Sequence, residues 1–183
     1  SEKSILFITT SPVKKALHGL ANIFVSQAIS ELFTIADESA AGALEIPTDI
    51  IFDDFATGAK VSDMPEKLSI CRAKGIAFSG ILLQSESQLK RMYGEYESIE
   101  IIDQCDSYVF FGGNNYETAK ALSLKMNVPL DEILYLPVGR IIVFRRGQKP
   151  VFSTRYDIFH DEFYQKRQHH DKEHPVCHTD QPF

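Results

Sequence analysis

Short apolar runs alternate with amphipathic segments along most of this 183-residue chain. Runs rich in β-branched and aromatic residues predict buried strands at 4–10, 48–56, 76–84 and 107–113. Apolar residues recur at helical spacing between them, which predicts helices at about 14–38, 65–74, near Leu89 and Met92, at 99–102 and at 115–126. Strands and helices in this order predict an α/β fold, with a mainly parallel sheet flanked by helices on both faces.

The C-terminal quarter of the chain has a different pattern. Residues 141–153 predict a β-hairpin that turns at Gly147-Gln148. After about residue 156 aliphatic residues are few and histidines are frequent, which predicts a helical turn followed by a loose tail. We therefore expect one domain over 1–156 and a separate His-rich segment over 157–183.

Composition narrows the possible partners of the chain. Its formal net charge of −6 argues against a surface that binds nucleic acid everywhere, although a local basic patch stays possible. No stretch reaches ~20 uninterrupted apolar residues, so we expect no membrane insertion by this segment. The 3 cysteines are widely spaced, which favours free thiols in a reducing compartment over a disulfide framework.

Two adjacent acids, Asp53 and Asp54, follow the apolar run of the second predicted strand. In a doubly wound sheet, ligands bind beyond the carboxyl ends of the strands, where these acids fall. One carboxylate at such an edge can hold Mg²⁺ through water while the next activates a nucleophilic water. Gln84 ends the neighbouring strand, where its amide can orient water or contact a γ-phosphate. A solvated turn and a loop-capping amide are the structural alternatives for these residues.

A phosphate-binding loop is absent from the sequence. No GxxxxGK[ST] motif occurs, and neither Gly58 nor Gly112-Gly113 is followed by the lysine that such a loop requires. Without a backbone nest and a lysine, the isolated chain is expected to bind nucleoside triphosphate poorly.

A collinear set of motifs resembles a known family. The pieces IIFDDFA, PEKLSICR, LLQS, SQL and CDSYVFFGG occur in the order found in the cytoplasmic ATPase domain of type IV secretion coupling proteins, the TraG/TraD-like conjugative group. The resemblance covers about Ser4 to Arg155. It implies a RecA-like P-loop NTPase fold, represented here without its Walker A unit.

The resemblance also implies roles for particular residues. Asp53 corresponds to the Walker B aspartate, which holds Mg²⁺ through water. Asp54 stands where the family usually has a catalytic glutamate, and its side chain is one methylene shorter. Gln84 matches a sensor position, and Arg72 matches an arginine near the subunit boundary that contacts nucleotide of a neighbouring subunit. A helix-end arginine that only complements the helix dipole is the alternative for Arg72.

For the whole protein, the resemblance implies a ring-forming ATPase, usually a hexamer, that uses ATP and Mg²⁺ and is attached to the cytoplasmic face of the inner membrane. The implied partners are relaxosome or secretion-channel proteins, with DNA also possible. Residues from Ser87 to Met126 correspond to a region that recognises a relaxosome accessory protein. Two alternatives stay open: a non-catalytic docking or assembly module with a degenerate half-fold, and an unrelated doubly wound enzyme.

Two further clusters could bind ligands. The tail places possible Zn²⁺ or Ni²⁺ ligands within ten residues, namely His169, His170, His174, Cys177 and His178. A solvated tail is the structural alternative, which we favour because no paired cysteine motif accompanies them. Basic residues also gather around the predicted hairpin: Arg140, Arg145, Arg146, Lys149 and Arg155. They suit either phosphate contact or a charged strand edge that resists aggregation.

Overall fold

The computed structural model describes residues 3–10, 16–57 and 60–173. The chain forms two compact units, Ser1–Tyr108 and Val109–Phe183. The elements of the first unit are α1 (Ala16–Glu38), β1 (Thr48–Phe52), α2 (Met64–Cys71), the 3₁₀ turn η1 (Arg72–Lys74), β2 (Ile76–Ile81), α3 (Glu86–Tyr93) and α4 (Glu95–Gln104). The strand β3 (Ser107–Phe110) lies at the division between the units.

The second unit holds α5 (Tyr116–Met126), α6 (Leu130–Leu134), β4 (Arg140–Arg145), β5 (Val151–Thr154), the 3₁₀ turn η2 (Ile158–His160) and α7 (Glu162–Glu173). The α/β class is confirmed, and so are the predicted helices and the C-terminal hairpin, whose strands β4 and β5 pair antiparallel. The short helix α6 was not predicted, because five residues carry too little periodicity to reveal a helix. The domain boundary near 156 falls between β5 and η2 and stays a prediction.

The strands lie in two sheets rather than in a continuous one. β1 and β2 form a parallel pair, and the other sheet has the order β3-β4-β5. The register of β1 and β2 shifts once, because Ile50 lies opposite Phe78 whereas Ile51 lies opposite Gly80. Glycine suits this position, since a Cβ there would approach Ile51 Cγ2 at 3.2 Å. Ser79 is therefore the extra residue of a β-bulge, and its N–H donates to Asp49 Oδ1 at 3.3 Å.

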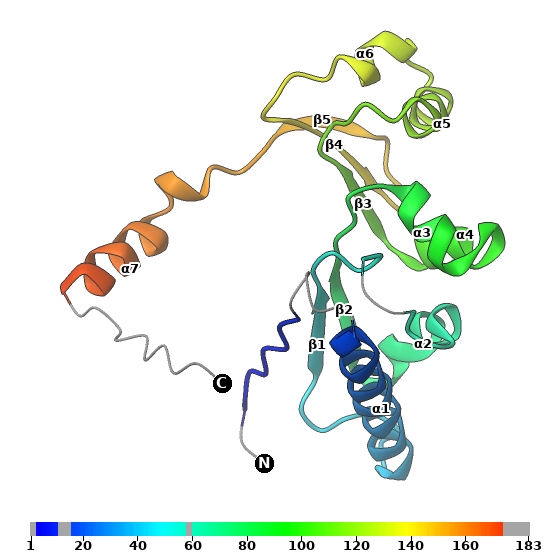
Figure 1. The fold of residues 1–183 in the computed structure, drawn as a ribbon, viewed down its shortest axis with the longest axis vertical. Coiled ribbons are helices and arrows are strands. Elements are labelled where there is room, and N and C mark those ends of the chain that lie inside the picture. Colours follow the sequence, from blue (N-terminus) through cyan, green and yellow to red (C-terminus); the bar gives the residue numbers. More distant parts are fainter. Residues whose placement is uncertain (1–2, 11–15, 58–59, 174–183) are drawn as a thin grey trace. The chain divides into compact units, whose positions relative to one another are not determined.

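Helices α1 and α2 lie beside this strand pair (Figure 1). Ile29 of α1 packs into a core with residues of the strands, of α3 and of α4. The fully or nearly fully buried members of this core are Ile29, Phe55, Val61, Met64, Leu89, Tyr93 and Ile101. Burial of these side chains is the main stabilising contribution to the first unit.

The predicted strand at 4–10 is wrong. Residues 3–10 have no regular secondary structure, and Ile5, Leu6 and Phe7 are 71–84% exposed. An apolar run becomes a strand only when another strand satisfies its backbone N–H and C=O groups, and no described residue pairs with this one. The run is β-prone in composition but has no sheet to join here.

Helix α1 is long and apolar enough to cross a membrane by length and composition over His18–Glu38. The prediction of no membrane insertion considered only uninterrupted apolar runs, and α1 has polar residues within it. One such helix is weak evidence for a span, since core helices of soluble proteins pass the same criteria. In this fold α1 buries Ile29 and Ala36, which are 2% and 0% exposed, but only 11% of its apolar stretch is buried.

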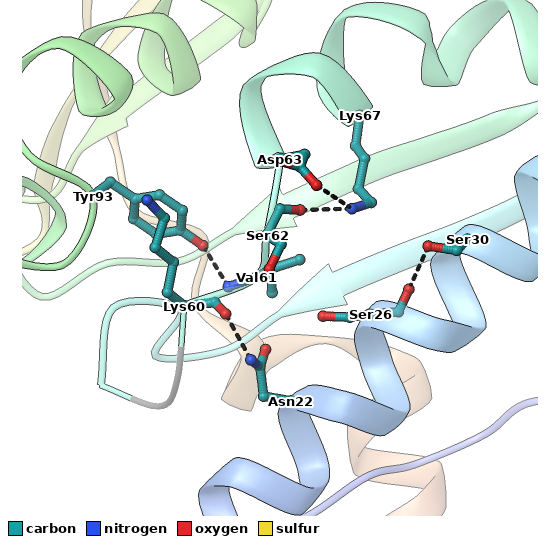
Figure 2. A network of polar contacts seen from close by, with 9 residues as sticks. All are labelled: Asn22, Ser26, Ser30, Lys60, Val61, Ser62, Asp63, Lys67 and Tyr93. Carbon is teal, nitrogen blue, oxygen red and sulfur yellow. Dashed lines mark hydrogen bonds and ion pairs between the residues drawn. The ribbon is translucent and has the colours of Figure 1, made fainter.

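Hydrogen bonds join the residues just before α2 to α1, to α3 and to the side chain of Lys67 (Figure 2). The Tyr93 hydroxyl oxygen accepts a hydrogen bond from the buried Val61 N–H at 3.0 Å. Asn22 Nδ2 of α1 donates to the Lys60 carbonyl at 2.6 Å, and Lys67 Nζ donates to the Ser62 carbonyl at 2.6 Å. Burial raises the pKa of Tyr93 to about 12, so its hydroxyl stays neutral over the physiological range.

Tyr93→Phe is expected to lower the free energy of unfolding by about 1–3 kcal/mol, because the Val61 N–H loses its buried acceptor. Urea unfolding of the 183-residue chain measures the change. Tyr96→Phe is the matched control, since Tyr96 is 84% exposed. Equal midpoints for the two variants would contradict a stabilising role for this hydrogen bond.

The same tyrosine predicts a pH dependence at alkaline pH. The pKa of Tyr93 lies above its ordinary value of 10.0, so folding favours the neutral phenol. Its contribution to stability is complete below pH 10.0 and is lost as the pH rises through about 12. Wild-type stability should therefore fall more steeply than that of Tyr93→Phe across this window.

Candidate functional site

The two acids lie in a tight turn that directly follows β1. Beyond the strand, Leu82 N–H donates to the Phe52 carbonyl at 2.9 Å, and Phe55 N–H donates to the Leu82 carbonyl at 3.0 Å. These bonds hold both ends of the Asp53-Asp54 turn against the end of β2. Asp54 has a left-handed backbone with φ of 51°, which aspartate tolerates better than most residues.

Aromatic packing of Phe55 holds the turn against the core. The Phe55 ring stacks on Tyr93 at 5.5 Å and lies 5.0 Å from Phe52, between ring centroids. Phe55 and Ala56 are buried, whereas Asp53 and Asp54 are exposed. The sequence thus places two solvent-facing carboxylates on a turn whose following residues are fixed in the core.

The structure brings Gln84 to Asp54. Gln84 Nε2 donates to Asp54 Oδ1 at 3.1 Å, across 30 residues of sequence. Parallel pairing explains this, since the carboxyl ends of β1 and β2 lie at the same edge. The edge therefore presents two carboxylates, which are oxygen ligands that suit Mg²⁺ and its bound waters, and beside them the amide of Gln84. The catalytic roles of Asp53, Asp54 and Gln84 stay predictions.

Arg72 lies at the other end of the strand pair. It belongs to η1, which precedes β2, whereas the acids follow β1. Its guanidinium pairs with the Asp106 carboxylate. Arg72 is thus not brought to Asp53 within one subunit, and a contact with a neighbouring subunit's nucleotide stays a prediction.

The cysteines, the histidine-rich tail and the basic residues of the hairpin are the remaining candidate site residues. Burial raises the pKa of the Cys71 and Cys105 thiols, which keeps them protonated and poorly nucleophilic at neutral pH. No group of three or more metal-ligating side chains occurs among the described residues. His174, Cys177 and His178 of the tail lie outside the described residues. The five basic residues around the hairpin are exposed, as both of their interpretations require.

One site residue was missed from the sequence. Gln88 Nε2 donates to Gln84 Oε1 at 3.2 Å, which extends the polar chain from Asp54 into α3. No helical spacing indicated this contact, because Gln84 precedes the N-cap Ser85 and lies outside α3. The groove of about 640 Å³ beside α1 and the start of α2 includes neither these residues nor Asp53.

Comparison with known proteins gives one family match. Residues 47–126 match the family described as the TraM recognition site of TraD and TraG. This range contains both acids, Gln84, Gln88 and Arg72. No curated protein sequence matches the chain significantly.

Solved structures of the bacterial conjugative coupling protein TrwB have a similar fold. TrwBdeltaN70 with sulphate aligns with a TM-score of 0.64 at 21% identity, over 77% of this chain and 37% of that one. TrwB with the ATP analogue ADPNP aligns at 0.62 and 23% identity, over 76% and 36%. TrwB with ADP and Mg²⁺ aligns at 0.60 and 20% identity, over 76% and 38%.

These alignments confirm the RecA-like fold, and the chain spans little more than a third of the length of the structures that it matches. The family match covers the segment from the start of β1 to the end of α5. Over residues 47–126 the chain is therefore similar in sequence to TraG/TraD-like coupling proteins, and its fold is similar to that of the coupling protein TrwB.

Proposed function

We propose that this chain is part of a coupling-protein motor ATPase that delivers DNA, or DNA with bound protein, to a conjugative type IV secretion channel. The observation that carries the proposal is the hydrogen bond from Gln84 to Asp54 at the carboxyl edge of β1 and β2. A catalytic acid and a sensor glutamine need this proximity to act on one nucleotide. The matched family supports the same assignment.

In this proposal Asp53 holds Mg²⁺ through a water molecule. Two adjacent exposed carboxylates provide the hard oxygen ligands that the ion prefers, so the residues present fit it. Bound Mg²⁺ would neutralise charge on the phosphates of ATP. Asp54 would activate the attacking water, and Gln84 would respond to the γ-phosphate. The hydrogen bond between them holds both side chains near the position of that water.

We propose further that the phosphate loop is contributed from outside these 183 residues, because the sequence contains none. The matched coupling-protein structures are more than twice as long as the aligned part. By the family resemblance, the whole protein assembles as a ring, usually a hexamer, on the cytoplasmic face of the inner membrane. Residues 47–126 would contact a relaxosome protein, as the description of the matched family suggests.

Asp53→Asn in the gene that encodes this chain is expected to reduce conjugative DNA transfer by on the order of 100-fold, because the amide weakens the hold on Mg²⁺. Transfer frequency between donor and recipient cells is the measurement. Glu38→Gln, an exposed neutralisation at the end of α1 and outside residues 47–126, is the control. Wild-type transfer with Asp53→Asn would contradict the motor proposal.

A second candidate is a docking or assembly module without catalysis. The missing phosphate loop, the aspartate at position 54 and the recognition function named for the matched family favour it for the isolated chain. This candidate predicts that Asp53→Asn leaves transfer unchanged, whereas exposed substitutions within 87–126 reduce it. The same transfer assay therefore separates the two.

Calorimetry tests the isolated chain directly. With Mg²⁺ and ATP we expect a dissociation constant on the order of 1 mM or weaker, because no backbone nest or lysine holds the phosphates. Asp53→Asn provides the baseline for any heat that comes from the site. Micromolar binding by the wild-type chain, absent in the variant, would show that the site is complete without a Walker A loop.

A further inference from the structure

The start of α3 has the sequence of a capping box. Ser85 is the N-cap, and its Oγ accepts a hydrogen bond from Gln88 N–H at 3.4 Å. In a complete capping box, the side-chain oxygen of the residue at N3, here Gln88, accepts in return from the N-cap backbone N–H. In a capping box, a side chain at this position normally stabilises the N-terminus of its own helix.

The Gln88 side chain does not form the capping-box hydrogen bond in this structure. Its Oε1 is buried and has no hydrogen-bond partner, whereas its Nε2 donates to Gln84 Oε1 at 3.2 Å. A buried acceptor without a partner is costly, and the capping-box bond would have satisfied it. The Gln88 side chain therefore contacts Gln84, in the loop before α3, instead of the N-cap of its own helix.

The Asp54 carboxylate sets the direction of the whole chain of hydrogen bonds. A carboxylate only accepts, so Gln84 must present its NH₂ group to Asp54 and its oxygen to Gln88. Gln88 must then present its own NH₂ group, which leaves its oxygen facing the interior. If Gln88 released this contact, the exposed Gln84 amide could rotate and present its oxygen elsewhere.

We infer that Gln88 is a positioning residue that fixes the orientation of the Gln84 amide toward Asp54. Its effect on catalysis rests on the function proposed above, but the orientation itself is a property of this chain. Gln88 does not touch the site of the reacting water and acts through Gln84 alone. The arrangement leaves the buried Gln88 Oε1 without a hydrogen-bond partner, which is destabilising.

Side-chain amide resonances of the 183-residue chain test the inference by NMR. The Gln84 NH₂ pair is identified by its loss in Gln84→Glu. In Gln88→Met, which keeps length but removes the donor, we expect the Gln84 pair to move to the position of an exposed amide. In Gln88→Glu the new carboxylate attracts the Gln84 NH₂ group, so the bond to Asp54 is lost more completely. Gln104→Met, at an exposed position on α4, is the control.

Thermal unfolding separates positioning from ordinary packing. Gln88→Met removes a buried oxygen that has no partner, so its Tm should equal or exceed that of the wild type. A lowered Tm with an unmoved Gln84 amide pair would mean that Gln88 is merely structural, and would overturn the inference. A Gln84 pair unmoved in both Gln88 variants would overturn it as well.

DNA transfer then connects the orientation to function. We expect Gln88→Met to lower transfer about five- to tenfold, as for the loss of one hydrogen bond, and Gln88→Glu to lower it further. If the motor proposal fails, transfer is insensitive to Asp53→Asn while the Gln84 amide pair still moves. If transfer responds to Asp53→Asn but neither the amide pair nor transfer responds to Gln88, the positioning inference alone is wrong.

Discussion

The parallel pairing of β1 with β2 continues past the ends of both strands, through the hydrogen bonds that join Leu82 to Phe52 and Phe55. This extension fixes the backbone on both sides of the Asp53-Asp54 turn. The bulge at Ser79 contributes, because one extra residue in β2 brings Ile81 opposite Phe52 and Leu82 opposite the turn. Without this register, Gln84 would meet a different residue of the first loop.

Helix α3 contributes residues to both the core and the polar site. Leu89 and Tyr93 of α3 are buried at 0% and 5% exposure, and Tyr93 stacks against Phe55 just after the acids. Gln88 precedes Leu89 and reaches Gln84. Through Tyr93 the packing of α3 positions the turn that carries the acids, and through Gln88 it positions Gln84. The stability of the unit and the geometry of the site therefore depend on the same helix.

The predictions from sequence succeeded where the signal was local. The apolar runs that became β1, β2 and β3 were recognisable, and so was the helix predicted at 65–74, because periodicity acts over a few residues. The strand predicted at 4–10 failed because strand formation depends on a distant partner, which no local pattern reports. The direct contact of Asp54 with Gln84 was implied only by analogy to parallel sheets.

By itself, the sequence determined the strands and helices between residues 48 and 126, the two acids at the end of a strand and the lack of a phosphate loop, since each is a property of neighbouring residues. Only the tertiary structure decided which side chains meet. It paired Gln84 with Asp54, turned Gln88 away from its capping box and separated Arg72 from the acids. Register and bulge position decide these contacts, because a shift of one residue reverses the face that each side chain occupies.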